Sequence, residues 1–306
     1  MHKKSLLVAV IICMISLTAL STHLAKASPI TVNVSPSSGS HGTTVAVSGD
    51  DATPNGEIRV YLGTFANLFA ATTNANSTGD YSTHFKVPTL PFGPYTVLVL
   101  DVETEDTSTE LFIIEPTITL SIEEGSCGDE VMVEGHGFDV ASPITLEFDS
   151  IDVTPSPQPQ TDDFGSFIAQ FNVSKFPEGR YRVYASDGAN GAFAFFRVVP
   201  KIILYTTSGP PSTPVFVNGT GFAPHSAVSL RFGSINVTMY PPTSTGADGS
   251  FMQLFLVPDV PDGLYMVAAI VEDSNSAEAP FAAPSPILTL TPDTTSGHAV
   301  VTAAGS

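Results

Sequence analysis

The segment Phe255-x-Val257-Pro258-x-x-Pro261-x-Gly263-x-Tyr265-x-Val267 decides the fold, because the chain contains it three times. The earlier copies span residues 171–183 and 85–97, at offsets of 84 and 86 residues that hold at every position. Ser174 replaces the first proline in the middle copy. Matches this numerous at constant offsets exclude chance, and they indicate a tandem array of one structural unit.

Other residues keep the same spacing. A Val-x-Val-x-Gly pattern ends at Gly49, Gly135 and Gly219, and three further glycines each stand two residues before an aromatic residue: Gly79 before Tyr81, Gly165 before Phe167 and Gly249 before Phe251. These matches predict repeats over residues 28–115, 116–199 and 200–285. Residues 286–306 then begin a fourth repeat that stops at its second strand.

Each repeat is expected to be all-β. Residues 227–232 and 235–240 alternate apolar with other residues around a Gly233-Ser234 turn, and 24 Gly and 25 Pro favour turns over long helices. About seven short strands in roughly 85 residues fit an immunoglobulin-like β-sandwich. The fold class predicted is therefore a tandem array of such sandwiches.

The Gly-x-Tyr-x-Val segment resembles the tyrosine corner of immunoglobulin-like domains, in which the tyrosine stands two residues before the second cysteine. Tyr95, Tyr181 and Tyr265 would be the corner residues, with valine in place of that cysteine. The chain has no Trp, so aliphatic packing is expected to replace the usual contact of a disulfide with an indole ring.

A more specific resemblance lies upstream of the corner. Val217-Asn-Gly-Thr-Gly-Phe222, followed by Arg231-Phe-Gly-Ser-Ile-Asn-Val237, resembles the IPT/TIG-type immunoglobulin-like repeat, and residues 133–138 match it too. The first repeat departs from it, with Asp51 where the others have the second glycine. The Gly-x-Tyr-x-Val half is more typical of repeats on archaeal and bacterial surface proteins. This resemblance implies a fold and a surface or secreted setting, but no particular function.

The N-terminus is typical of a secretory signal peptide over residues 1–27. Lys3 and Lys4 precede a 15-residue apolar run, and Ala25-Lys-Ala27 is a small-x-small cleavage signal. An uncleaved membrane anchor is the alternative, although the run is short for a span. Cleavage would remove three of the 11 basic residues and none of the 30 acidic ones, leaving a formal charge of −22. Such acidity argues against nucleic acid and anionic membranes as partners, and we expect a secreted or cell-surface protein.

The last 21 residues leave three interpretations open. The chain is a fragment of a longer protein, or its last two strands complete the sheet of a neighbouring molecule, or the end is naturally frayed. Two strands alone do not bury a sandwich core.

The residues that carry chemistry do not form a catalytic pattern. The sequence has no Gly-x-Ser-x-Gly elbow, phosphate-binding loop or dinucleotide fingerprint, and no Cys/His pair has metal-ligand spacing. Acidic residues near turns are weak calcium candidates, with solvated turn residues as the alternative: Glu103, Glu105, Asp106, Asp162 and Asp163. No other cofactor is expected. After cleavage only Cys127 remains, so no internal disulfide is expected.

The sequence contains an excess of N-glycosylation sequons. Five of the ten Asn residues stand in Asn-x-Ser/Thr sequons, an excess that suggests glycosylation of an exported protein. These candidates are Asn33, Asn76, Asn172, Asn218 and Asn236.

Two functions remain in competition. The first is a non-catalytic extracellular or cell-surface structural or adhesion protein, such as a stalk, spacer or surface-layer component. The second is an array of carbohydrate- or ligand-binding modules attached to an enzyme domain that lies outside this chain. Partners would be surface proteins or glycans, and exposed aromatic faces would favour the second function. The tyrosines left for such a face are Tyr61, Tyr184, Tyr205 and Tyr240.

Overall fold

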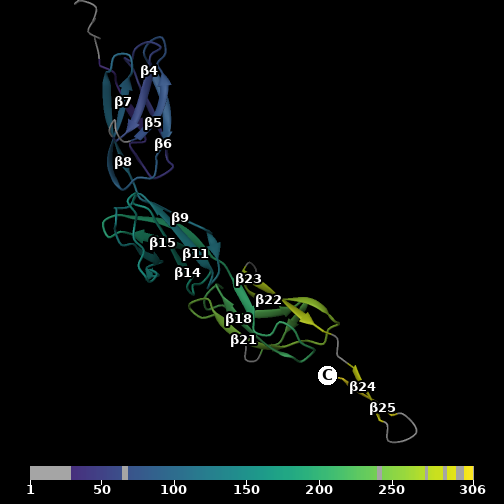
Figure 1. Ribbon diagram of the computed structural model, residues 1–306. Coiled ribbons are helices and arrows are strands. Elements are labelled where there is room, and N and C mark those ends of the chain that lie inside the picture. The colour runs from purple at the N-terminus through teal and green to yellow at the C-terminus, as the bar shows by residue number, and fades with distance from the viewer. Residues whose placement is uncertain are drawn as a thin grey trace, which may run out of the picture. The chain divides into compact units, whose positions relative to one another are not determined.

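A computed structural model describes residues 29–63, 68–239, 243–272, 275–284, 288–293 and 300–305 (Figure 1). The predicted signal peptide and Tyr240 lie outside this described part. The described residues form strands, bridges and turns without a helix, so the all-β prediction is confirmed. No helix in this part of the chain has the length and apolarity needed to span a bilayer.

The chain divides into two compact units, residues 1–88 with 93–115, and residues 89–92 with 116–306. The first unit contains one sandwich with a three-stranded and a five-stranded sheet. In sheet order the strands are β1 (Asn33–Ser35), β3 (Thr44–Gly49) and β6 (Tyr81–Lys86), then β2 (Ser38–Gly39), β8 (Thr107–Ile114), β7 (Gly93–Asp101), β4 (Glu57–Leu62) and β5 (Leu68–Asn74).

The second unit contains two more sandwiches. The first of them has sheets of three and five strands: β14 (Phe167–Asn172), β11 (Glu130–His136) and β9 (Thr117–Leu120), then β10 (Glu124–Gly125), β16 (Gly191–Val198), β15 (Gly179–Ser186), β12 (Thr145–Phe148) and β13 (Ile151–Asp152). The other has sheets of three and four strands: β17 (Lys201–Leu204), β18 (Pro214–Thr220) and β21 (Phe251–Leu256), then β20 (Ile235–Val237), β19 (Ser229–Phe232), β22 (Gly263–Glu272) and β23 (Asn275–Ala283). Tandem immunoglobulin-like sandwiches are thus confirmed as the fold class.

The period-two alternation of the sequence places one face of each sheet in a core. Along β11, Val131 and Val133 are fully buried while Met132 between them is 47% exposed. The core of the second repeat adds Phe148, Val183 and aliphatic residues of β16. Cys127, the single cysteine in the described part, is free, so burial of apolar surface holds this core without a disulfide.

A glycine opposite an aromatic ring recurs in all three sandwiches. Gly135 pairs with Phe167 between β11 and β14, and Gly49–Tyr81 and Gly219–Phe251 are the equivalent pairs. A Cβ atom on any of these glycines would overlap the facing ring. The glycine therefore leaves the space in which the ring lies, which explains why both positions repeat in the sequence.

Asp51 explains how the first repeat departs from the Gly-x-Gly-Phe pattern. The second glycine of that pattern has a left-handed backbone at Gly137 and Gly221, with φ of 75° and 74°. Asp51 stands at the same position and also has a positive φ, 59°. Asp is among the few residues that enter this region at modest cost, so the backbone turn persists without the glycine.

A side-chain acceptor, buried in the first and third repeats and half-buried in the second, fixes the loop that follows each of these turns. Asp187, between β15 and β16, accepts hydrogen bonds from the backbone N–H of Asp139, at 2.8 Å, and of Asn190, at 2.6 Å. Asp101 accepts one from Thr53 N–H in the first repeat, and Asn275 accepts one from Ala223 N–H in the third. We call this contact the loop clamp. It is made by a carboxylate in two repeats and by an amide in the third.

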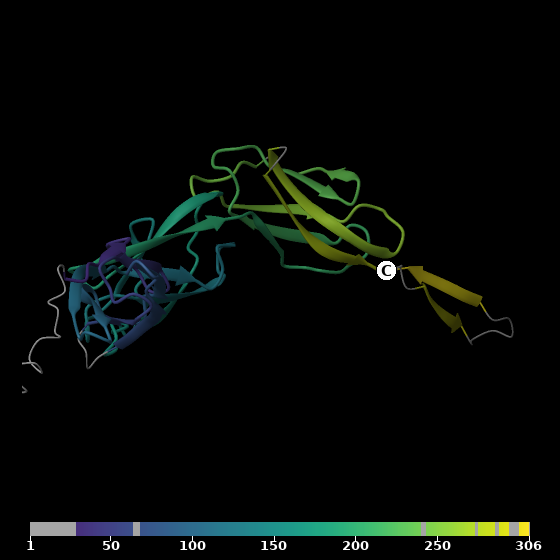
Figure 2. The same cartoon turned by 90° about the horizontal axis from the view of Figure 1, so that it is seen from above.

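The last two strands of the described part form a hairpin (Figure 2). Their residue register is the one found between the equivalent strands of the preceding repeats. β24 (Leu288–Asp293) and β25 (Val300–Gly305) place Leu290 opposite Ala303. Leu204 and Val217, 86 residues earlier, pair in the same way between β17 and β18. A fourth repeat beginning here stays a prediction, to which this register adds support.

Replacing Gly135 with valine should destabilise the second repeat by about 1–3 kcal/mol, because the new side chain must displace the Phe167 ring. Urea unfolding combined with hydrogen exchange would locate the loss in β11 and β14. Met132→Val is the control, since it alters the exposed side of the same strand. Equal exchange in Gly135→Val and the unchanged chain would contradict the account of the glycine.

The Asp187 clamp should make the second repeat sensitive to acid. Burial alone would raise the pKa of this carboxyl, but its bonds from Asp139, Asn190 and Ala189 hold the pKa below its usual value. The stabilisation is therefore complete above the unfolded pKa of about 3.9 and is lost as the pH falls through the folded pKa. Asp187→Asn should flatten the dependence of unfolding free energy on pH between about 5 and 2. An unchanged slope would contradict this role.

Candidate functional site

The calcium candidates lie in turns. Glu103, Glu105 and Asp106 occupy the turn between β7 and β8, and Asp162 precedes β14 with Asp163 beside it. Asp162 Oδ1 accepts the backbone N–H of Phe164 and of Ser166, both at 2.9 Å, as turn residues do. Within the described ranges no three acidic, His or Cys side chains are close enough together to hold a metal. Calcium binding stays a prediction without support from clustering.

His136 lies in a short polar chain that the sequence did not indicate. Its Nδ1 lies 2.9 Å from Ser166 Oγ, and its Nε2 lies 3.3 Å from Glu134 Oε1. The order Ser–His–Glu resembles a nucleophilic triad. A nucleophile elbow, however, directs the N–H of the residue after the serine toward the oxyanion, and here that residue, Phe167, is paired with Gly135 within the sheet. We interpret the chain as fixing the start of β14.

Two corner tyrosines bond to the backbone four residues upstream. Tyr181 Oη donates to the Pro177 carbonyl at 3.0 Å, and Tyr265 Oη donates to the Pro261 carbonyl at 2.9 Å. Burial raises the pKa of the half-buried Tyr95 hydroxyl, which occupies the equivalent position. These tyrosines are engaged in the sandwich. Tyr205, by contrast, is 64% exposed.

The outer face of β15 and β16 gathers arginine and aromatic side chains. Along β15, Arg180, Arg182 and Tyr184 point to the same side by strand alternation, and β16 places Arg197, Phe195 and Phe193 directly opposite them. Phe193 is 56% exposed and Phe195 is 42% exposed. We call Arg180, Arg182, Tyr184, Phe193 and Phe195 the arginine–aromatic face.

The arginines of this face lie against its rings. The Arg180 guanidinium carbon lies 3.9 Å from the centre of the Phe195 ring, and that of Arg182 lies 5.2 Å from the centre of Tyr184. Both distances are within the range of a cation–π interaction. Phe193 and Phe195 meet edge to face at 5.5 Å between ring centres. The guanidinium groups of Arg180 and Arg182 therefore pack on aromatic rings and remain exposed to solvent.

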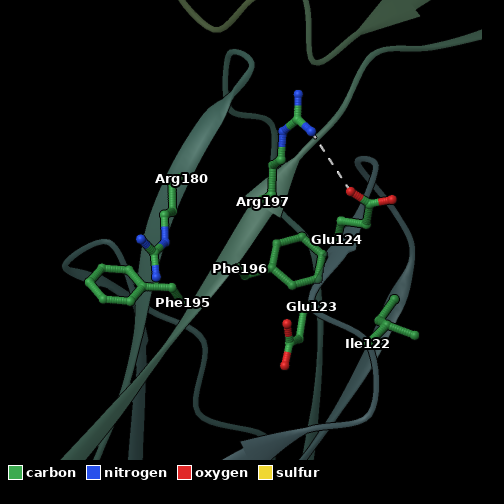
Figure 3. A pocket seen from close by; sticks show the side chains of 7 residues that line it. All are labelled: Ile122, Glu123, Glu124, Arg180, Phe195, Phe196 and Arg197. Carbon is green, nitrogen blue, oxygen red and sulfur yellow. Dashed lines mark ion pairs between the residues drawn. The ribbon is translucent and has the colours of Figure 1, made fainter.

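A hollow of about 580 Å³ lies at one end of the face (Figure 3). Arg180 and Phe195 line one side, and Ile122, Glu123 and Glu124 line the other, which follows β9 in the chain. A second hollow of about 230 Å³ shares Arg180, Phe195 and Glu123 with it and extends over Thr119 and Leu120. The stacked Arg180–Phe195 pair thus borders two adjoining hollows.

Arg197 differs from its two neighbouring arginines because carboxylates surround it. Its guanidinium lies 3.1 Å from Glu178 Oε1 and 3.9 Å from Glu124 Oε2. No ion pair between Arg180 or Arg182 and a carboxylate is present among the described residues. The uncompensated positive charge of this sheet therefore lies at Arg180 and Arg182.

The last two strands of the larger sheet carry neither arginine nor aromatic residues at the equivalent positions of the other two repeats, although Tyr61 and Arg231 face the same side from the neighbouring strands β4 and β19. The offsets place Pro94, Thr96 and Leu98 of β7, and Leu264, Met266 and Ala268 of β22, at the positions of Arg180, Arg182 and Tyr184. Across the sheets, Leu111 and Pro280 stand where Phe195 stands, since Leu111 pairs with Thr96 and Pro280 with Met266. The sandwich does not need these arginines and rings to fold, because two of its three copies lack them.

The sequons lie elsewhere on the sandwiches. Asn33, Asn172 and Asn218 belong to the three-stranded sheets, Asn76 lies in a turn and Asn236 lies on β20. All are exposed except Asn218, which is half-buried. The larger sheet of the second repeat contains no sequon, so glycans at these sites would leave the arginine–aromatic face uncovered.

Expression in a glycosylating host should give unequal occupancy. Exposed Asn236 should carry glycan more often than half-buried Asn218, because the transferring enzyme must reach the amide nitrogen. Glycopeptide mass spectrometry would measure both sites, with Asn218→Gln as the control for assignment. Higher occupancy at Asn218 would contradict this ranking.

Comparisons with known proteins leave the family open. No family model matches the chain, and no curated protein matches it either. Solved structures are similar only in part. SGBP-B of the Bacteroides ovatus mixed-linkage glucan utilization locus, solved with a mixed-linkage heptasaccharide, is 12% identical, with 87% of this chain and 74% of that chain covered and a TM-score of 0.31.

Two further structures show the same level of similarity. Invasin, a bacterial integrin-binding protein, is 10% identical, with a TM-score of 0.28 over 86% of this chain. The chain spans 62% of the invasin structure. The I9–I11 tandem of titin is 10% identical, with a TM-score of 0.22 over 81% of this chain and 97% of that one. No ligand or partner is transferred from similarities this low, and the IPT/TIG assignment stays a resemblance.

Proposed function

We propose that the chain is a non-catalytic secreted or cell-surface repeat protein that serves as a spacer and makes contact through its second repeat. The observation that carries this proposal is the difference between copies of one framework. Arginine and exposed aromatic residues occupy outward positions on the last two strands of the second repeat's larger sheet. The matching positions of the other two repeats hold no arginine and no aromatic residue, and Glu278 stands where Phe193 stands. Arg, Tyr and Phe are the residues enriched where proteins bind partners.

The rest of the chain supports a structural role for the other two repeats. Their cores, turns and loop clamps repeat those of the second, while Leu, Met and Thr stand at the positions of its paired arginines and phenylalanines. The calcium candidates lie in turns, and the corner tyrosines donate hydrogen bonds within the sandwich. The alternative function places an enzyme domain outside this chain. No residue of the described part bears on that domain, and the alternative stays a prediction.

Truncating the face should abolish attachment without unfolding the protein. The variant Arg180→Ala/Arg182→Ala/Phe195→Ala removes exposed side chains, and we expect retention on cell-envelope preparations of the source organism to fall about tenfold or more. Leu264→Ala/Met266→Ala is the matched control, at the corresponding positions of the third repeat. Circular dichroism would establish that both variants fold. Retention that falls equally in both variants, or in neither, would overturn the proposal.

A further inference from the structure

The two uncompensated arginines indicate the charge of the ligand. Five of the eight basic residues outside the predicted signal peptide lie between Lys175 and Lys201, in a chain with 30 acidic residues. Two of the five, Arg197 and Lys201, are paired with carboxylates, and Arg180 and Arg182 are not among the ion pairs of the described residues. Arg180 and Arg182 expose their guanidinium groups, and stacking on a ring leaves the edge N–H groups free to donate. A planar guanidinium donates two parallel hydrogen bonds to a carboxylate. The face therefore favours a ligand that carries carboxylates.

The rings indicate what carries those carboxylates. Phe193 and Phe195 offer flat apolar surfaces beside the arginines, suited to the C–H face of a sugar ring. The hollow of about 580 Å³ falls within the range of small-ligand sites, roughly 300–1,000 Å³. The adjoining hollow shares Arg180 and Phe195, so a linear chain of sugars has room to continue past the stacked pair.

Neighbouring carboxylates limit how far an acidic ligand extends. Glu147 pairs with Tyr184 across the sheet from β12, and Glu123 and Glu124 line the far side of the larger hollow. A broad acidic protein surface, which buries about 800 Å² in a stable complex, would meet these carboxylates. A narrow polymer placed along Arg182, Arg180 and the phenylalanines avoids most of them.

We propose that the arginine–aromatic face binds an acidic polysaccharide, with sugar carboxylates held by Arg180 and Arg182 and sugar rings packed on Phe193 and Phe195. This inference rests on the proposed function, since it names the ligand of the same contact surface. The acidity of the remaining chain then disfavours anionic ligands over most of the rest of the surface.

Calorimetry of the full chain with polygalacturonate tests the proposal. We expect measurable binding that weakens as salt rises from about 50 to 500 mM, over which charge screening strengthens. Fully methyl-esterified polygalacturonate has the same backbone without charge. Its affinity should be at least about tenfold lower, because Arg180 and Arg182 would lose their charge-assisted hydrogen bonds to the sugar carboxylates.

Variants distinguish binding at the arginine–aromatic face from nonspecific electrostatic binding elsewhere on the protein. Arg180→Gln/Arg182→Gln should bind polygalacturonate at least about tenfold more weakly, and Phe193→Ala/Phe195→Ala should do so while keeping every charge. Arg59→Gln/Arg231→Gln is the control, because it removes the same number of charges from other repeats. Equal losses in the two arginine pairs would overturn the assignment to this face.

The remaining outcomes each identify a different error. Equal affinity for poly-glutamate would overturn the polysaccharide in favour of an acidic protein partner. Equal affinity for the methyl ester would overturn the role of the carboxylate. Absence of binding to polygalacturonate, with envelope retention still dependent on Arg180 and Arg182, would reject the ligand class and leave the proposed function standing. Loss of that dependence as well would reject both.

Discussion

The packing of an aromatic ring over a glycine is the contact on which each sandwich depends. It joins the second and third strands of the smaller sheet at the point where the chain enters its left-handed turn. The ring of Phe167 lies over Gly135. Phe138 follows Gly135 by three residues, and its ring packs against that of Phe167 with 5.3 Å between ring centres. Phe222 and Phe251 repeat that contact at 5.3 Å. One missing Cβ thus allows two rings to enter the core together.

The loop clamp holds the loop that follows that turn in place. Its acceptor lies in the hairpin of the last two strands of the larger sheet, within the turn for Asp187 and at a strand end for Asp101 and Asn275. The clamp therefore connects one sheet's loop to the other sheet's hairpin. That hairpin in the second repeat consists of β15 and β16, which carry the arginine–aromatic face. The same framework is present in the other repeats, and so outward residues on this hairpin change without cost to the core.

Much of the fold was predictable, because repetition and alternation both act through backbone geometry. The constant offsets already marked Gly135 and Phe167 as positions shared by all three repeats, and the Gly-x-Tyr-x-Val segment already marked the tyrosine corner that β15 contains. The contact face was harder to predict. Phe193 and Phe195 alternate with Ala194, which places them on one side of a strand, but alternation alone does not tell whether that side faces the core or the solvent. The role of Asp187 depends on Asp139, 48 residues away in the sequence, and no local pattern links the two.

The lack of a disulfide bears on how such a chain responds to tension. Cys127 has no cysteine partner, so no covalent link shortens a sandwich that is pulled open from its ends. A repeat of about 85 residues would lengthen to roughly 290 Å when fully drawn out. Because repeats in series bear the same tension as an attachment point, the unfolding of one sandwich would lengthen the chain and lower the force on that point, and the sandwich would refold from its own hydrophobic core once the force fell. A spacer built in this way would act as a damper as well as a support.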